Sequence, residues 1–156
     1  MIRPLQAADA ASVLTLAHET GLLTPAEIDD LRWRLDYYPQ RPESQRHRAL
    51  VWDEAGHITG AVYYAPVVMT DRTWSLHWLL ARPPFTAHGV AGWLLHHAEE
   101  DVRAQQGRLL VIETSSRPAL EGLRCLYEES VYEPGAVLPD FYADGEAQLI
   151  FRKRLL

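Results

Sequence analysis

The sequence is poor in cysteine, because Cys125 is the single one among 156 residues. One thiol excludes an intramolecular disulfide and offers no metal cluster. The sequence also lacks any apolar run near the roughly 18 residues that a membrane span needs. Its first ten residues, MIRPLQAADA, lack the apolar segment of a signal peptide. We therefore expect a cytoplasmic protein with no membrane partner.

Basic residues are also scarce: 15 Lys and Arg stand against 21 Asp and Glu, for a formal net charge of -6. Binding to a nucleic-acid backbone needs a dense basic face, so we expect no nucleic-acid partner. The seven histidines show no spacing typical of metal ligands. His96 and His97 are adjacent, and on a helix they would diverge by about 100°. We therefore expect no metal site.

Apolar residues make up 47% and charged residues 23% of the chain, as in ordinary globular proteins. We find no internal repeat, low-complexity segment or linker, and we expect one domain over residues 1–156. Apolar periodicity predicts its elements. The strands are expected at 1–5, 47–53, 58–68, 74–81, 108–114 and 148–155, with one more near 132–138. The helices are expected at 7–19, 23–35, 89–103 and 118–129.

The order of these elements predicts a mixed α/β sheet. The strands at 74–81 and 108–114 are joined through a helix, which favours a parallel, right-handed connection. Hairpins on either side add antiparallel strands. Thr24 and Glu27 stand three residues apart with Pro25 between them, which is typical of a capping box at a helix start.

The stretch FTAHGVAGWLLHH, residues 85–97, connects an expected strand to an expected helix. A helix N-terminus carries unpaired N–H groups and a partial positive charge, so it favours phosphate. Gly89 and Gly92 would let phosphate oxygens approach the backbone. Small residues at such a turn also serve packing alone, and the spacing by itself leaves both interpretations open.

The order of elements resembles that of the GNAT N-acetyltransferase superfamily, from Ile2 to Leu155. The family's phosphate loop, Gln/Arg-x-x-Gly-x-Gly/Ala, falls on residues 86–91, where the two small positions match and Thr86 replaces the long polar residue. The strand end IETSS (112–116) and the tail DFY-x-x-G to IFRKRL (140–155) are similar to those of a bacterial subgroup. Val131 replaces a glycine of the family's Tyr-Glu-x-x-Gly ending.

The resemblance implies a mixed central sheet flanked by helices, with two splayed parallel strands at the cofactor site. Acetyl-CoA would then be the co-substrate, with its pantetheine arm between the splayed strands. The backbone around Leu79, Leu80 and Ala81 would bind that arm. The phosphate loop would consist of Thr86, Ala87, His88, Gly89, Val90, Ala91 and Gly92.

The resemblance also implies catalytic residues. Tyr127 occupies the position of a family tyrosine that protonates the departing thiolate, although a packing role beside Leu120 and Leu123 is the alternative from periodicity alone. Glu113 is a candidate base or a structural acceptor, and His77 is the second candidate base. His18, Tyr63 and Tyr64 are candidates for the acceptor pocket. The five tryptophans are expected in the core: Trp33, Trp52, Trp74, Trp78 and Trp93.

The expected function is acetyl-CoA-dependent transfer of an acyl group to the amine of a small molecule or peptide. The acidic surplus favours a cationic amine. A GNAT-fold module that binds an acyl-CoA without turnover is the alternative, and a structural subunit is a further one. A homodimer is the assembly we would expect first, since two-fold dimers are the commonest.

Overall fold

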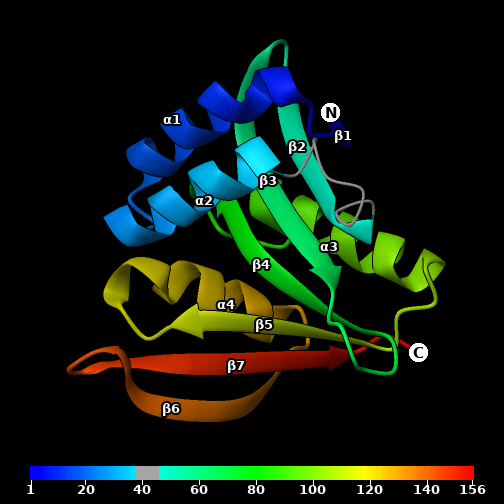
Figure 1. Ribbon diagram of the computed structural model, residues 1–156, viewed down its shortest axis with the longest axis vertical. Coiled ribbons are helices and arrows are strands. Elements are labelled where there is room, and N and C mark those ends of the chain that lie inside the picture. Colours follow the sequence, from blue (N-terminus) through cyan, green and yellow to red (C-terminus); the bar gives the residue numbers. More distant parts are fainter. Residues whose placement is uncertain (38–45) are drawn as a thin grey trace.

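The computed structural model describes residues 1–37 and 46–156. Seven strands form one sheet in the order β1-β2-β3-β4-β5-β7-β6 (Figure 1). Every neighbouring pair is antiparallel except β4 and β5, which are parallel. The strands are β1 (Ile2–Pro4), β2 (Arg48–Glu54), β3 (His57–Pro66), β4 (Thr73–Ala81), β5 (Leu109–Ser115), β6 (Glu133–Ala143) and β7 (Glu146–Arg154).

Helices cover both faces of the sheet. Figure 1 shows α1 and α2 in front of the strands β2 to β4 and α3 behind them, and α1 and α3 both contact β3. The core between these layers contains fully buried aliphatic side chains, including Leu16, Leu80 and Leu94. The helices are α1 (Ala10–Thr20), α2 (Pro25–Tyr37), α3 (Val90–Ala104) and α4 (Glu121–Glu129), with short 3-10 turns η1 (Ala7–Asp9) and η4 (Pro118–Leu120).

The two parallel strands separate along their length. Residues 73–76 of β4 pair with 109–112 of β5, and no pairing joins the strands beyond that point. The remainder of β5 pairs on its other side with β7. A bulge marks the start of the separation, because Tyr63 of β3 lies opposite Trp78 and Tyr64 lies opposite Leu76, which leaves His77 without a partner in the β3 register. The expected splayed pair is thus confirmed.

The order of elements expected from the sequence is confirmed, and most boundaries agree within two residues. The additional strand expected near 132–138 is longer, ending at Ala143, and forms an exposed edge of the sheet. The expectation for the tryptophans is wrong in two cases. Trp74 and Trp78 are buried, but Trp33 is 57% exposed and Trp93 is 42% exposed, since both lie on the outer faces of their helices.

Within the described residues, none of the helices is both long and apolar enough to cross a membrane. The same residues contain no cluster of three or more His, Cys, Asp or Glu side chains that could hold a metal ion.

Candidate active site

A cavity of about 220 Å³ lies where β4 and β5 separate. It brings together the three residues that the sequence suggested for catalysis, namely His77 from β4, Glu113 from β5 and Tyr127 from α4. Its walls also include Leu22 and Leu23 from the connection between α1 and α2. The polar or titratable residues that line it are Glu27, Ser75, His77, Glu113, Thr114, Ser115, Tyr127 and Tyr142.

Tyr127 is buried, and its ring packs against those of Tyr132 and Phe151, with centroids 6.1 Å and 5.8 Å away. Burial raises the pKa of its hydroxyl above the usual value of 10. The phenol therefore stays protonated at neutral pH. Within residues 1–37 and 46–156 the hydroxyl has no hydrogen-bond partner, so the residue presents an unused proton donor to the cavity that it lines.

Glu113 lies on the exposed side of β5 and lines the same cavity. The amide of Gln148 on β7 donates to its carboxylate over 3.3 Å. Gln148 is buried and also contacts the Tyr142 hydroxyl, while burial raises the pKa of that tyrosine. Glu113 of β5 and Tyr142 of β6 thus line the cavity, and Gln148 of β7 contacts both of them.

His77 lies at the bulge of β4, with its ring 5.6 Å from that of Tyr63 in an edge-on contact. Loss of hydration, the largest cause, and the positive charges of Arg34 and His47 lower the pKa of His77 to about 4. The imidazole is therefore neutral at physiological pH. A neutral imidazole with so low a pKa accepts a hydrogen bond well but is a weak base.

An adjoining recess of about 290 Å³ extends from this cavity toward α2. Both share Leu23, Glu27, His77 and Trp78 in their walls. Trp78 is buried, and its indole N–H has no partner among the described residues. The recess adds Asp30, so carboxylates of α2 face the space beside β4.

The backbone candidates of β4 lie beyond the bulge. Leu79, Leu80 and Ala81 pair with β3 and have buried side chains. None of them pairs with β5, so backbone groups on that side of β4 are not used in a ladder. Leu79 also lines the cavity.

The loop at residues 86–92 folds tightly onto the start of α3. The Gly89 amide donates to the Thr86 carbonyl over 3.0 Å, and no side chain caps the helix at Gly89. A Cβ at Gly92 would lie 2.4 Å from the Thr86 oxygen, and one at Gly89 would lie 2.9 Å from the Pro84 oxygen. The first turn of α3 contains no acidic residue.

These distances bear on the two interpretations of the glycines. The sequence left open whether they make room for phosphate or serve packing, and at both positions a Cβ would meet backbone carbonyl groups of residues 84–87. The closure of the loop therefore requires the glycines whether or not a phosphate binds there. The amides of Val90, Ala91 and Gly92 keep no intrahelical partner, as in any helix start.

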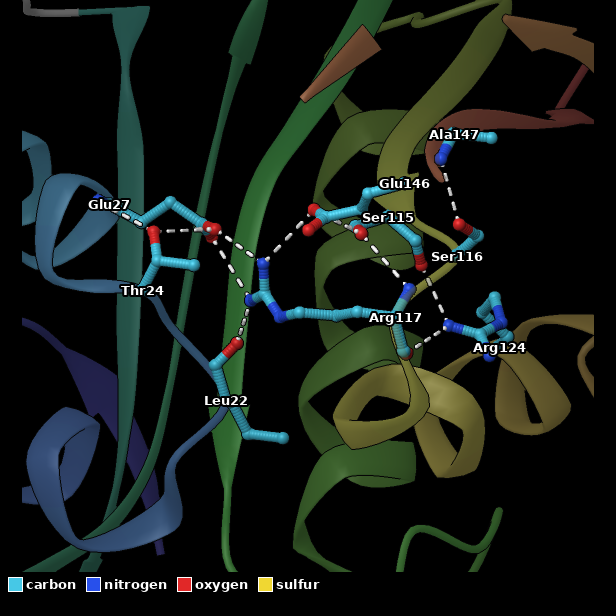
Figure 2. A network of polar contacts seen from close by, with 9 residues as sticks. All are labelled: Leu22, Thr24, Glu27, Ser115, Ser116, Arg117, Arg124, Glu146 and Ala147. Carbon is cyan, nitrogen blue, oxygen red and sulfur yellow. Dashed lines mark hydrogen bonds and ion pairs between the residues drawn. The ribbon is translucent and has the colours of Figure 1, made fainter. Parts of the chain in front are cut away.

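A network of polar contacts lies beside the cavity and shares Leu22, Glu27 and Ser115 with its walls (Figure 2). At its centre, Arg117 donates through Nη1 to Glu27 Oε1 over 2.7 Å and through Nη2 to the Leu22 carbonyl. Its Nη1 also lies 3.7 Å from Glu146 Oε2. The expected capping box is half formed: the Glu27 amide donates to Thr24 Oγ1 over 3.2 Å, whereas the Glu27 carboxylate accepts from the Thr24 hydroxyl over 3.0 Å and from Arg117.

Comparison with known proteins shows which family has this fold. The sequence model of the acetyltransferase (GNAT) family matches residues 16–127, which is most of the chain. The chain belongs to the GNAT family. A comparison of this GNAT chain with curated proteins found no match.

Solved structures of similar shape agree with the family. A Desulfovibrio desulfuricans protein assigned to the GNAT acetyltransferases is 28% identical, with a TM-score of 0.91 over 100% of this chain and 99% of its own. An aminoglycoside 6'-N-acetyltransferase complexed with coenzyme A is 14% identical, with a TM-score of 0.81 over 100% and 97%. A Salmonella typhimurium structure with its cofactor acetyl-CoA is 19% identical, with a TM-score of 0.79 over 100% and 94%.

Three sequence candidates for the acceptor pocket of this GNAT chain do not line the cavity. Tyr64 is fully buried, and its hydroxyl donates to Asp101 of α3 over 2.7 Å. Tyr63 is buried and stacks on Trp78, with ring centroids 5.5 Å apart. His18 is exposed on the last turn of α1. The alternation of β3 and the helical period of α1 direct these side chains elsewhere.

Sequence reasoning also missed residues that the fold of the GNAT chain brings to the site. Arg117 and Glu27 are 90 positions apart, and Gln148 and Glu113 are 35 apart. No local spacing joins such pairs. One signal in the sequence was the position of Arg117 directly after the IETSS strand end. A cation at the end of a central strand needs a carboxylate partner, although the sequence does not say which one.

Proposed function

We propose that the chain is an acetyl-CoA-dependent N-acetyltransferase that acts on the amine of a small molecule or peptide. The observation that carries the proposal is the cavity between the separated strands, where Tyr127, Glu113 and His77 meet. An aminoglycoside acetyltransferase of the same fold is solved with coenzyme A, and this supports acetyl-CoA as the co-substrate here.

The residues present fit both ends of that co-substrate. The uncapped start of α3, free of acidic side chains in its first turn, suits a phosphate group, because its amides and dipole favour an anion. The backbone of β4 beyond His77 has groups that β5 does not use, and these suit the amides of a pantetheine arm. The bound co-substrate would supply the activated acetyl group as a thioester.

Two cavity residues would each carry out one of the two proton transfers that the reaction needs. Glu113, held by Gln148, is placed to take a proton from the incoming ammonium, which frees the nitrogen lone pair for attack on the thioester carbon. Tyr127 is placed to give its proton to the departing sulfur as the carbon–sulfur bond breaks. Burial raises the pKa of the phenol, so the proton to be donated is present at neutral pH.

Thermal unfolding with added ligand tests the binding part of the proposal. A ligand that binds the folded but not the unfolded chain, at a concentration 100 times its Kd, raises the free energy of unfolding by about 2.7 kcal/mol. Acetyl-CoA should therefore raise the melting temperature, whereas acetyl-pantetheine, which lacks the phosphates, should raise it less. An unchanged melting temperature at saturating acetyl-CoA would contradict the proposal.

Thiol release across a panel of amines tests turnover. We expect release that depends on the amine, with cationic amines favoured. A chain that binds acetyl-CoA but releases no thiol with any amine would instead be an acyl-CoA-binding module.

A further inference from the structure

The side chain of Arg117 joins two parts of the molecule that the sheet leaves apart. The α1–α2 corner, defined here as residues 21–27, belongs to the part built on β1 to β4. Arg117 follows β5 and belongs to the part built on β5 to β7. Its guanidinium reaches across to Glu27 and to the Leu22 carbonyl of the corner, as Figure 2 shows.

The backbone of Arg117 is also held in place by hydrogen bonds. Its backbone amide donates to Ser115 Oγ over 3.1 Å, and that hydroxyl donates to Glu146 Oε2 over 2.7 Å. Arg124 donates to the carbonyls of Ser115 and Arg117 over 2.7 Å and 2.9 Å. The guanidinium thus projects from a rigid base, and its side chain is only 15% exposed.

The cavity lies between these two anchored parts. Leu22, Leu23 and Glu27 of the corner form one wall, and Ser115 belongs to the opposite one. Backbone pairing of β4 with β5 holds the strands together at residues 73–76 alone. At the other end, Arg117 spans the distance between the walls.

We propose that Arg117 is a positioning residue that fixes the width of the acceptor side of the cavity. The inference rests on the proposed function, because it assigns the α1–α2 corner to the amine. No residue of the 86–92 loop takes part in the network. Arg117 therefore governs the fit of the amine and leaves the grip on the phosphates unchanged.

Charge supports the same assignment. Arg117 lies between the carboxylates of Glu27 and Glu146 and compensates them. A lysine carries the charge but lacks the forked donors that serve Glu27 and the Leu22 carbonyl together. A small misplacement of a reacting group can lower the rate about 100-fold, so loss of this link should affect the amine strongly.

The test compares Arg117→Met with Arg103→Met as a control. Arg103 is also a partly buried, paired arginine, but it lies on α3 and contacts the Leu155 carbonyl and Glu99, outside the network that holds the corner. Hydrogen exchange of the free protein should be about 10-fold faster or more at the amides of residues 21–27 in Arg117→Met, and unchanged there in Arg103→Met. Equal exchange at the corner in both variants would overturn the proposal.

Kinetics test the consequence. Per folded molecule, Arg117→Met should raise KM for the amine about 10-fold while the Kd for acetyl-CoA changes less than about 2-fold, and Arg117→Lys should fall between it and the parent. A loss of acetyl-CoA affinity as large as the rise in KM would overturn the assignment to the amine. A parent that turns over no amine would refute the proposed function, and the exchange experiment would still decide whether Arg117 holds the corner.

Discussion

At the scale of single residues, Tyr127 allows chemistry to be separated from packing. Its ring packs between Tyr132 and Phe151, whereas its hydroxyl has no protein partner in the described chain. Removing the oxygen should therefore cost little stability. We expect Tyr127→Phe to lower the rate of thiol release roughly 100-fold, the usual worth of a general acid, with the Kd for acetyl-CoA unchanged.

The neighbouring Tyr132 provides the control. Its hydroxyl donates to the buried Glu99 over 3.1 Å, and it is not among the residues that line the cavity. Tyr132→Phe should lower the free energy of unfolding by about 1 kcal/mol, the net worth of a hydrogen bond, and keep the rate per folded molecule. Equal rates for the parent and Tyr127→Phe would leave Tyr127 as a packing residue.

The backbone at Val131 has a conformation that favours glycine. The resemblance described in the sequence analysis predicts a glycine here, and the structure gives Val131 a φ of 69°, in the left-handed region. That conformation costs a non-glycine residue about 1–2 kcal/mol, and the side chain is 73% exposed. We expect Val131→Gly to raise the free energy of unfolding by about 0.5–1 kcal/mol, after the entropy that glycine adds to the unfolded chain.

Chemical denaturation of Val131→Gly and Val137→Gly measures this effect. Val137 is a second exposed valine, 61% exposed on β6, where glycine should destabilise the strand. A loss of stability in both variants would show that Val131 is not strained.

At the scale of elements, the start of α3 depends on a loop that has no room for one more methyl group. A Cβ at Gly92 would lie 2.4 Å and 2.5 Å from the carbonyl oxygens of Thr86 and Ala87. In an ordinary helix, Gly→Ala stabilises by about 1 kcal/mol. Here we expect Gly92→Ala to destabilise the chain by about 1–3 kcal/mol, as overpacking does, and to weaken acetyl-CoA binding at least 10-fold.

Calorimetric titration with acetyl-CoA would measure the change in binding. Gly135→Ala serves as the control, because the nearest atom to its added Cβ is 3.4 Å away on β7. Wild-type affinity in Gly92→Ala would show that the loop adjusts freely and that its present shape is not needed for binding.

At the scale of the whole molecule, His77 links the site to acid stability. Its pKa lies at about 4 in the folded chain against an ordinary 6.5, so between these values the unfolded chain binds more protons. Stability therefore falls as the pH falls from 6.5 to 4. The His47 pKa is also lowered, by burial first and then by Arg34, which adds to the same trend.

Melting temperatures from pH 7 to pH 4 should show a smaller acid loss in His77→Gln than in the parent. The carboxyl groups of Asp9 and Asp53 also have lowered pKa values, with the hydrogen bonds from Arg3 as the largest cause. Most of their contribution is lost below their ordinary value of 3.8, and the part lost near pH 4 is the same in the parent and the variant. Parallel curves for the parent and the variant would exclude His77 as a source of the acid loss.

Much of the fold follows from the sequence because local patterns carry it. The period of two in the strands and the helical period of α3 and α4 bury one face of each element, and a parallel pair joined by α3 then follows from chirality. The site followed only in part. Glu113 and Tyr127 lie on elements whose positions the fold determines, whereas Tyr64 and Arg117 owe their roles to Asp101 and Glu27, which are distant in the chain.

The edge of the sheet at β6 has a consequence for solubility. Its apolar side chains Val137, Leu138, Phe141 and Tyr142 are all between 43% and 61% exposed, and an open strand with such residues invites pairing with other chains. Pro134 and Pro139 have no N–H to offer to an added strand, and Asp140 turns the backbone to a φ of 57°. An added strand would find no N–H to accept from at either proline, and such positions weaken the pairing of an exposed edge with other chains.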